Sequence, residues 1–61
     1  MPVITLEGSM LSTEQKRALT ARLTQDAAEV MQIPAQHFVV LIKENSRDNI
    51  GVGGTLLADK V

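Results

Sequence analysis

The chain has 61 residues, of which 44% are hydrophobic, with no cysteine and a formal net charge of −1. This length predicts a single domain over residues 1–61, and chains this short usually need a disulfide, a metal or oligomerisation for stability. The lack of cysteine excludes disulfides and thiolate metal sites, and the single histidine, His37, cannot build a metal site alone. Oligomerisation is the remaining solution, so we expect a homo-oligomer.

Charge and hydropathy exclude two classes of partner. The six basic residues are scattered along the chain and form no basic stripe, which argues against nucleic-acid binding. The longest apolar run, residues 38–42, is too short to span a membrane. The N-terminus also lacks the basic flank and apolar core of a signal peptide. We therefore expect a cytoplasmic protein with no nucleic-acid or membrane partner.

The first predicted element is a short strand over residues 3–6, closed by Glu7 and Gly8. Pro2 stands directly before it, behind Met1, and proline is tolerated at the start of a strand. Removal of Met1 would make the Pro2 nitrogen a free secondary amine, which titrates close to neutral pH. Partial burial lowers the pKa of such an amine further. Pro2 is therefore a candidate general base for proton abstraction next to a carbonyl group.

A helix follows the strand. It opens with a capping box, in which the Ser12 hydroxyl and the Gln15 side chain satisfy backbone N–H groups reciprocally. Apolar residues at helical spacing form one stripe: Leu19, Leu23, Ala27, Val30 and Met31. Pro34 restricts the backbone of the residue before it, so we expect the helix to end near Gln32.

The second predicted strand covers residues 38–42, a run rich in β-branched side chains that is typical of a strand covered on both faces. His37 is expected to cap this strand at the surface. A polar loop over residues 45–49 leads to a glycine-punctuated turn over residues 50–54, and residues 55–61 are expected to form a short tail. The turn lacks the lysine of a P-loop, so its glycines are predicted to permit positive φ or close subunit approach.

Strand, helix and strand in this order predict a β-α-β unit with parallel strands and a right-handed crossover. The expected fold class is α+β, a β-α-β unit followed by a glycine-rich turn or hairpin. Two strands and one helix leave one face of the sheet uncovered, and isolated two-stranded sheets are marginal in water. We therefore expect other copies of the chain to complete the fold, with residues 51–54 crossing onto a neighbouring subunit.

Together these elements resemble the 4-oxalocrotonate tautomerase family, and within it the short DmpI-like branch. The resemblance covers essentially the whole chain. It rests on Met1-Pro2 before a strand, Glu7-Gly8 after it, Glu14-Gln15-Lys16 at the helix start and the turn Ile50-Gly51-Val52-Gly53-Gly54. It implies a βαβ chain assembled as a homohexamer, a trimer of dimers, with an amino-terminal proline as catalytic base. The implied reaction is tautomerisation of an unsaturated 2-oxo acid or enol, with no cofactor and no metal.

The resemblance carries over unevenly to individual site residues. Pro2 matches the catalytic base, and Ile50 stands where the family places an aromatic wall of the substrate site. The two arginines with which the family grips its substrate are missing, since residues 9–11 contain none and Val39 occupies the place of the other. Arginine binds carboxylates bidentately. We therefore expect a 2-oxo acid or enol whose binding needs fewer cationic side chains than that of the dicarboxylate oxalocrotonate.

Two residues are candidates to replace the missing cations. Lys43 lies four residues after Val39, which places both on the same strand face. Arg47 lies in the loop that leads to Ile50. Either could reach a substrate carboxylate from a neighbouring subunit, and for each the alternative is an ordinary solvated surface charge.

Two other functions stay open from the sequence. The same scaffold supports proline-dependent hydration, dehalogenation or decarboxylation, in which a protonated proline is the general acid. The chain could also be a non-catalytic oligomeric subunit of a homohexamer or a mixed hexamer, an interpretation that the missing arginines fit. Retention of Met1 would favour the non-catalytic subunit, because Pro2 would then stay acylated.

Overall fold

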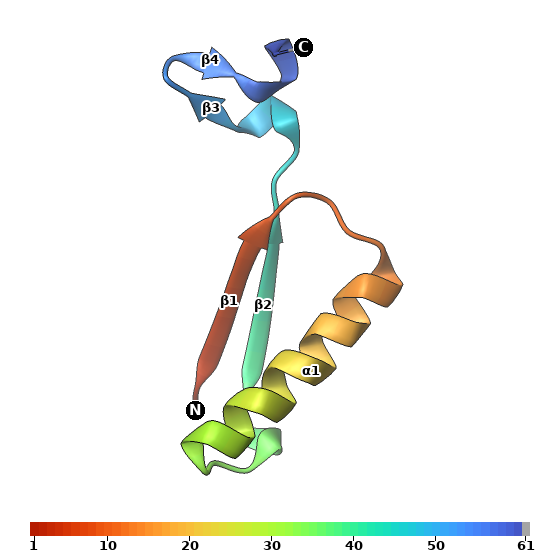
Figure 1. Ribbon diagram of the computed structural model, residues 1–61, viewed down its shortest axis with the longest axis vertical. Helices are drawn as coiled ribbons and strands as arrows, with labels where there is room; N and C mark the ends of the chain where they lie inside the picture. Colours follow the sequence, from red (N-terminus) through yellow and green to blue (C-terminus); the bar gives the residue numbers. More distant parts are fainter. Residues whose placement is uncertain (61) are drawn as a thin grey trace.

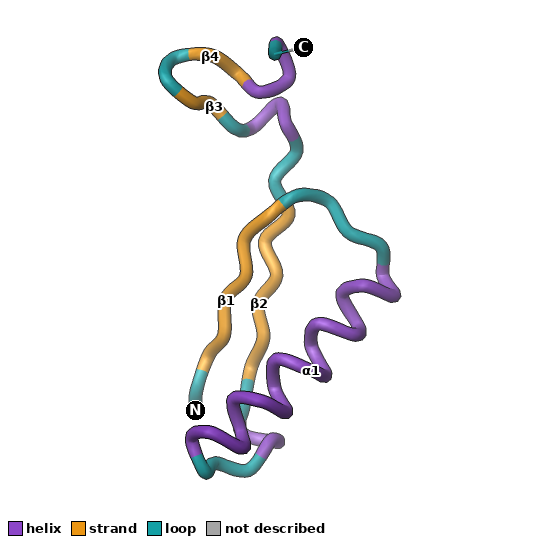
Figure 2. Tube along the Cα trace, viewed as in Figure 1, coloured by secondary structure: helices purple, strands orange, loops and turns teal. Residues whose placement is uncertain are grey.

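The computed structural model describes residues 1–60, which form a strand, a helix, a second strand and a hairpin (Figures 1 and 2). The helix and strands are β1 (Val3–Gly8), α1 (Thr13–Met31), β2 (Val39–Glu44), β3 (Gly51–Val52) and β4 (Thr55–Leu56). Short 3₁₀ helices precede β2, precede β3 and follow β4: η1 (Ala35–His37), η2 (Arg47–Asn49) and η3 (Leu57–Asp59). This order confirms the expected α+β architecture.

The central sheet consists of β1 and β2, which pair in parallel with Val3 opposite Val39 and Gly8 opposite Glu44. The parallel β-α-β unit is therefore confirmed, but the predicted strand ends are wrong. β1 ends two residues later than predicted, while β2 begins one residue later and ends two residues later. The ladder of backbone hydrogen bonds continues through Glu7 and Lys43, whose polar side chains had suggested that the strands end before them.

Helix α1 begins and ends as predicted. The Ser12 Oγ accepts a hydrogen bond from the Gln15 N–H at 3.1 Å, and the Gln15 Oε1 accepts one from the Ser12 N–H at 2.9 Å. Two orphan donors of the first turn are thereby satisfied. At the other end Gln32 has φ of 59°, and its N–H bonds to the Ala28 carbonyl, which closes the helix two residues before Pro34.

The predicted apolar stripe of α1 is right for its first three members and wrong for its last two. Leu19, Leu23 and Ala27 are half-buried, whereas Val30 is 81% exposed and Met31 is 51% exposed. The helix has 19 residues and is therefore about 28 Å long. Six-residue strands span only about 20 Å, so the last turn has too little sheet to pack against.

The segment before β2 also differs from the prediction. His37 does not cap the strand but ends the 3₁₀ helix η1, in which the His37 N–H donates to the Pro34 carbonyl at 3.0 Å. The next N–H, that of Phe38, donates to the Ala35 carbonyl. Backbone bonds thus hold residues 35–38 in a turn, and β2 starts only at Val39.

Residues 46–60, which we call the arm, project beyond the end of the sheet (Figure 1). The expected tail over residues 55–61 is wrong within the described range, because Thr55–Leu56 forms β4 and pairs with β3. Gly53 and Gly54 reverse the chain with φ of 62° and 88°. A Cβ added at either glycine would meet nothing within 4 Å, so the positive φ, not space, requires glycine there.

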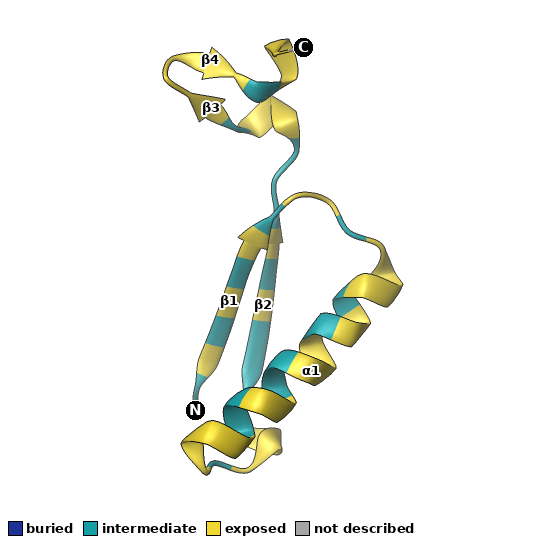
Figure 3. Cartoon of the chain, in the orientation of Figure 1, coloured by how far each residue is buried: buried dark blue, intermediate teal, exposed yellow. Residues whose placement is uncertain are grey.

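The sheet of the single chain is covered on one face only (Figure 3). Ile4, Leu6 and Ile42 are half-buried on the face that α1 covers, whereas Val3 is 52% and Leu41 is 47% exposed on the other. None of residues 1–60 is fully buried. No helix in this range combines the length and apolar character needed to cross a membrane.

The capping box yields the first testable prediction. Ser12→Ala removes the acceptor for the Gln15 N–H and should lower the free energy of unfolding by about 1 kcal/mol. Urea denaturation at one fixed protein concentration measures it. Ser46→Ala is the matched control, because Ser46 precedes η2 in the same N-cap position without a side-chain capping bond. An equal loss in both variants would contradict a specific role for the capping box.

Candidate functional site

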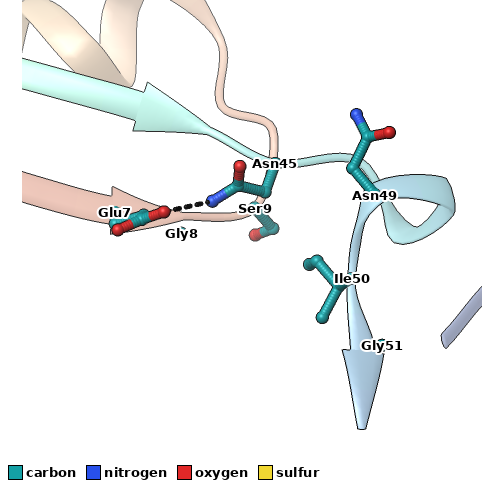
Figure 4. A pocket seen from close by; sticks show the side chains of 7 residues that line it. All are labelled: Glu7, Gly8, Ser9, Asn45, Asn49, Ile50 and Gly51. Atoms are coloured by element: carbon teal, nitrogen blue, oxygen red, sulfur yellow. Dashed lines mark hydrogen bonds between the residues drawn. The ribbon is translucent and has the colours of Figure 1, made fainter. Parts of the chain in front are cut away.

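An open pocket of about 480 Å³ lies where the sheet meets the arm (Figure 4). The end of β1, the loop after β2 and the start of the arm contribute its lining residues: Glu7, Gly8, Ser9, Asn45, Asn49, Ile50 and Gly51. They offer a carboxylate, two amides and a hydroxyl group beside one aliphatic wall, Ile50. No basic side chain lies among them.

Asn45 ties the two strand ends together at the edge of this pocket. Its backbone N–H donates to the Gly8 carbonyl at 2.8 Å, and its Nδ2 donates to the Glu7 Oε2 at 3.0 Å. Figure 4 shows the second of these bonds. Because Asn45 directly follows β2 and Gly8 ends β1, the sheet pairing brings the two together. The Gly8 side of the pocket is therefore held by backbone and side chain at once.

Glu44 forms a second polar cluster next to the pocket. Its Oε2 accepts a hydrogen bond from the Leu11 N–H at 2.9 Å, and its Oε1 pairs with the Lys16 Nζ at 2.9 Å. Both side chains are partly buried. The hydrogen bond from Leu11, followed by the hydrogen bond from Lys16, holds the pKa of the Glu44 carboxyl below its usual value, although burial acts in the opposite direction.

Sequence analysis missed the role of Glu44, although two signals were present. Glu44 follows Lys43 and so lies on the strand face that α1 covers. Lys16 stands in the first turns of the helix, where its side chain can reach the end of β2. Glu7 lies on the other face and bonds to Asn45, so the two carboxylates do not form an acid–base pair.

Pro2 lies at the opposite end of the sheet from the pocket. It is half-buried at the start of β1, and its carbonyl accepts a hydrogen bond from the Val39 N–H at 3.0 Å. Met1 before it is 88% exposed. Pro2 and Val39 are thus brought together by the strand pairing, as neighbours at the first rung of the sheet.

The other predicted site residues lie far from Pro2. Lys43 is exposed and stands opposite Glu7 near the pocket end of the sheet. Arg47 and Ile50 belong to the arm, where the Arg47 guanidinium donates to the Leu57 carbonyl at 2.6 Å. Six residue steps along β1 separate Pro2 from the pocket, a distance of about 20 Å. A single chain therefore holds the predicted residues in two separate groups.

Residues 1–60 contain no cluster of three or more histidine, aspartate or glutamate side chains placed to hold a metal ion.

A sequence profile of the family described as "Tautomerase enzyme" matches residues 2–60. The chain belongs to the tautomerase family. A probable tautomerase of Halalkalibacterium halodurans is 40% identical over 63 aligned residues, which cover 98% of this chain and all of the relative. The expected family is therefore confirmed from sequence.

Solved structures of tautomerase homologues support the same assignment. A 4-oxalocrotonate tautomerase homologue superposes with a TM-score of 0.89 at 32% identity, covering 100% of this chain and 98% of the other. DmpI from Archaeoglobus fulgidus gives a TM-score of 0.82 at 40% identity, covering 95% and 100%. A heterohexameric 4-oxalocrotonate tautomerase of Chloroflexus aurantiacus gives 0.79 at 26% identity, covering 100% and 98%. The tautomerase fold and the resemblance to DmpI-like proteins are confirmed.

Glu44 makes the stability of the fold depend on pH in a predictable direction. A pKa lowered by folding stabilises the protein fully above the unfolded-state pKa of glutamate, about 4.3. That stabilisation is lost as pH falls below this value and through the folded-state pKa. Glu44→Gln should therefore be less stable than the wild type near pH 7, with the difference shrinking towards pH 3.

Chemical denaturation over this pH range at constant ionic strength measures the effect. Glu14→Gln is the control for loss of a carboxylate, because Glu14 pairs with the exposed Arg17 on the helix surface. A difference between Glu44→Gln and the wild type that stays constant with pH would contradict the prediction.

Proposed function

We propose that this tautomerase-family chain is a cofactor-independent keto–enol tautomerase that acts on an unsaturated 2-oxo acid or enol. Its general base is the nitrogen of Pro2, freed by removal of Met1. The observation that carries the proposal is the position of Pro2, half-buried at the start of β1 directly behind an exposed Met1. Membership of the tautomerase family supports the reaction class.

The chemistry follows from a free secondary amine at this position. The uncharged Pro2 nitrogen takes a proton from an acidic position of the substrate, the enol hydroxyl or a carbon next to the carbonyl, and becomes a secondary ammonium. The electrons left behind spread over the carbonyl oxygen as a dienolate. The ammonium then returns its proton to the conjugated carbon, which gives the isomer and restores the amine. Partial burial favours the uncharged base, because desolvation lowers the pKa of an amine.

The proposed site lies between copies of the chain. Pro2 is about 20 Å along β1 from the pocket, so the two cannot act on one substrate within a single chain. The uncovered sheet face supports association, since Val3 and Leu41 would leave water in a contact with another copy. The related heterohexamer of Chloroflexus aurantiacus supports an assembly of six chains here. We therefore propose a homohexamer, a trimer of dimers, in which Pro2 of one copy faces the pocket of another.

The residues of the proposed site have distinct roles. Ile50 is an aliphatic wall that excludes water from the reacting atoms, and Val39 lines the site beside Pro2. Lys43 and Arg47 are the candidate cations for a substrate carboxylate. Lys43 makes no ion pair within residues 1–60, which favours it over Arg47, whose guanidinium already bonds to the Leu57 carbonyl. With one available cation, a substrate with a single carboxylate is favoured over a dicarboxylate.

Pro2→Ala tests the base directly. We expect its kcat/KM for phenylenolpyruvate to fall at least about a hundredfold, the usual contribution of a general base. The assay follows enol-to-ketone conversion by ultraviolet absorbance, with 2-hydroxymuconate as the dicarboxylate for comparison. Intact mass must show that both proteins have lost Met1. Pro34→Ala is the matched control, because Pro34 is the other proline of the chain.

Equal activity of Pro2→Ala and the wild type would contradict the proposal that Pro2 is the general base. A protein that starts at Pro2 and turns over neither enol would point to hydration, dehalogenation or decarboxylation by the same proline. Retention of Met1 without activity would indicate a non-catalytic subunit.

Subunit complementation tests whether the site is shared between copies. Pro2→Ala lacks the base, and Ile50→Glu places a charge in the aliphatic wall, so each should be inactive alone. Unfolding both together and refolding them should restore about a quarter of wild-type activity, the share of sites in which both halves are intact when subunits mix at random.

The control replaces Ile50→Glu with the double variant Pro2→Ala/Ile50→Glu, which supplies no base and should restore nothing. If native mass spectrometry shows mixed assemblies but no activity returns, the two halves of the site belong to the same chain.

A further inference from the structure

Residues 9–11, which we call the connector, join β1 to the cap of α1 and contribute Ser9 to the pocket. The described residues give the connector one hydrogen bond, from the Leu11 N–H to the Glu44 carboxylate at 2.9 Å. Met10 is 64% exposed, so packing holds the middle of the connector weakly. The position of the connector therefore depends on Glu44.

We propose that Glu44 is a positioning residue for substrate binding, which fixes the connector and with it the Ser9 wall of the pocket. The proposal rests on the proposed function, because it takes this pocket to be the substrate site. Glu44 itself touches no substrate in this arrangement, since its two carboxylate oxygens face Leu11 and Lys16.

The geometry around Glu44 supports a fixed position. Lys16 of α1 pairs with one carboxylate oxygen, which leaves the other aimed at the Leu11 N–H. Hydrogen bonds to a charged acceptor are stronger than neutral ones. One side chain thus links the end of β2, the first turns of α1 and the connector.

The neighbouring residue completes the wall. Asn45 bonds to the Gly8 carbonyl at 2.8 Å, and Glu44 bonds to Leu11, so Ser9 lies between two anchored points. Loss of Asn45 would release the chain at Gly8, before Ser9, and loss of Glu44 would release it at Leu11, after Ser9. Strand pairing also holds Gly8, whereas Leu11 belongs to no strand, so the Leu11 end depends more on its side-chain partner.

The test is the variant Glu44→Ala, for which KM and kcat are both measured with phenylenolpyruvate. We expect KM to rise about tenfold, because the connector loses its charge-assisted hydrogen bond and Ser9 is no longer held in place, while kcat changes less than about twofold. The Leu11 amide should exchange its hydrogen faster. Glu44→Gln keeps an oxygen that can accept from Leu11, so it should recover part of the loss in KM. Glu14→Ala is the control, because Glu14 is a carboxylate near Lys16 in the first turn of α1 that pairs with Arg17 and makes no bond to the connector.

A binding measurement separates this proposal from the proposed function. In the Pro2→Ala background, NMR titration with phenylpyruvate gives a Kd that does not depend on turnover, and adding Glu44→Ala should raise that Kd about tenfold. If Pro2→Ala alone keeps full activity, the proline mechanism fails while the Kd comparison still stands. An unchanged KM and Kd in Glu44→Ala, with kcat reduced only in proportion to the assembled fraction, would overturn the positioning role.

Discussion

The β1–β2 sheet has a helix on one face and none on the other, and the remaining features of this chain depend on that imbalance. Half-exposed Val3 and Leu41 lie on the open face, and no residue from 1 to 60 is fully buried. Short domains bury a smaller share of their surface than long ones, so leaving an apolar sheet face in water is costly for the stability of a chain of this length. In the assembly that we propose, another copy covers the open face and satisfies this constraint without a disulfide or a metal.

The same geometry explains why the candidate site is divided. Parallel pairing puts Pro2 beside Val39 at one end of the sheet and Gly8 beside Glu44 at the other. Pro2 and the pocket lie at opposite ends of one strand, so they can meet only across two chains that are arranged head to tail or antiparallel. In our proposal, assembly therefore serves folding and catalysis through the same contacts. The two carboxylates near the pocket have different roles: Glu44 accepts a hydrogen bond from the Leu11 backbone, whereas Glu7 lines the cavity.

Local signals in the sequence predict much of the fold. The capping box at Ser12 and the restriction imposed by Pro34 place both ends of α1, because each acts within a few residues. Pairing and packing over long distances are not predictable in this way. The Glu44–Lys16 pair depends on the register of β2 and on which face of the sheet α1 covers. The hairpin of the arm depends on the direction in which the chain leaves the turn at Gly53 and Gly54. The family resemblance named Ile50 as a wall, but chain spacing alone cannot reveal its distance from Pro2.

The hydrogen bonds of the arm run mainly within the arm itself, from Arg47 to the Leu57 carbonyl and from the Leu57 N–H to the Ile50 carbonyl. The β-α-β unit is held by a separate set of contacts. Mutations in the arm can thus reshape the wall at Ile50 while the rest of the chain keeps its stability. In our proposal, substitutions in the arm therefore change the range of substrates, whereas substitutions in the strands and the helix change folding first.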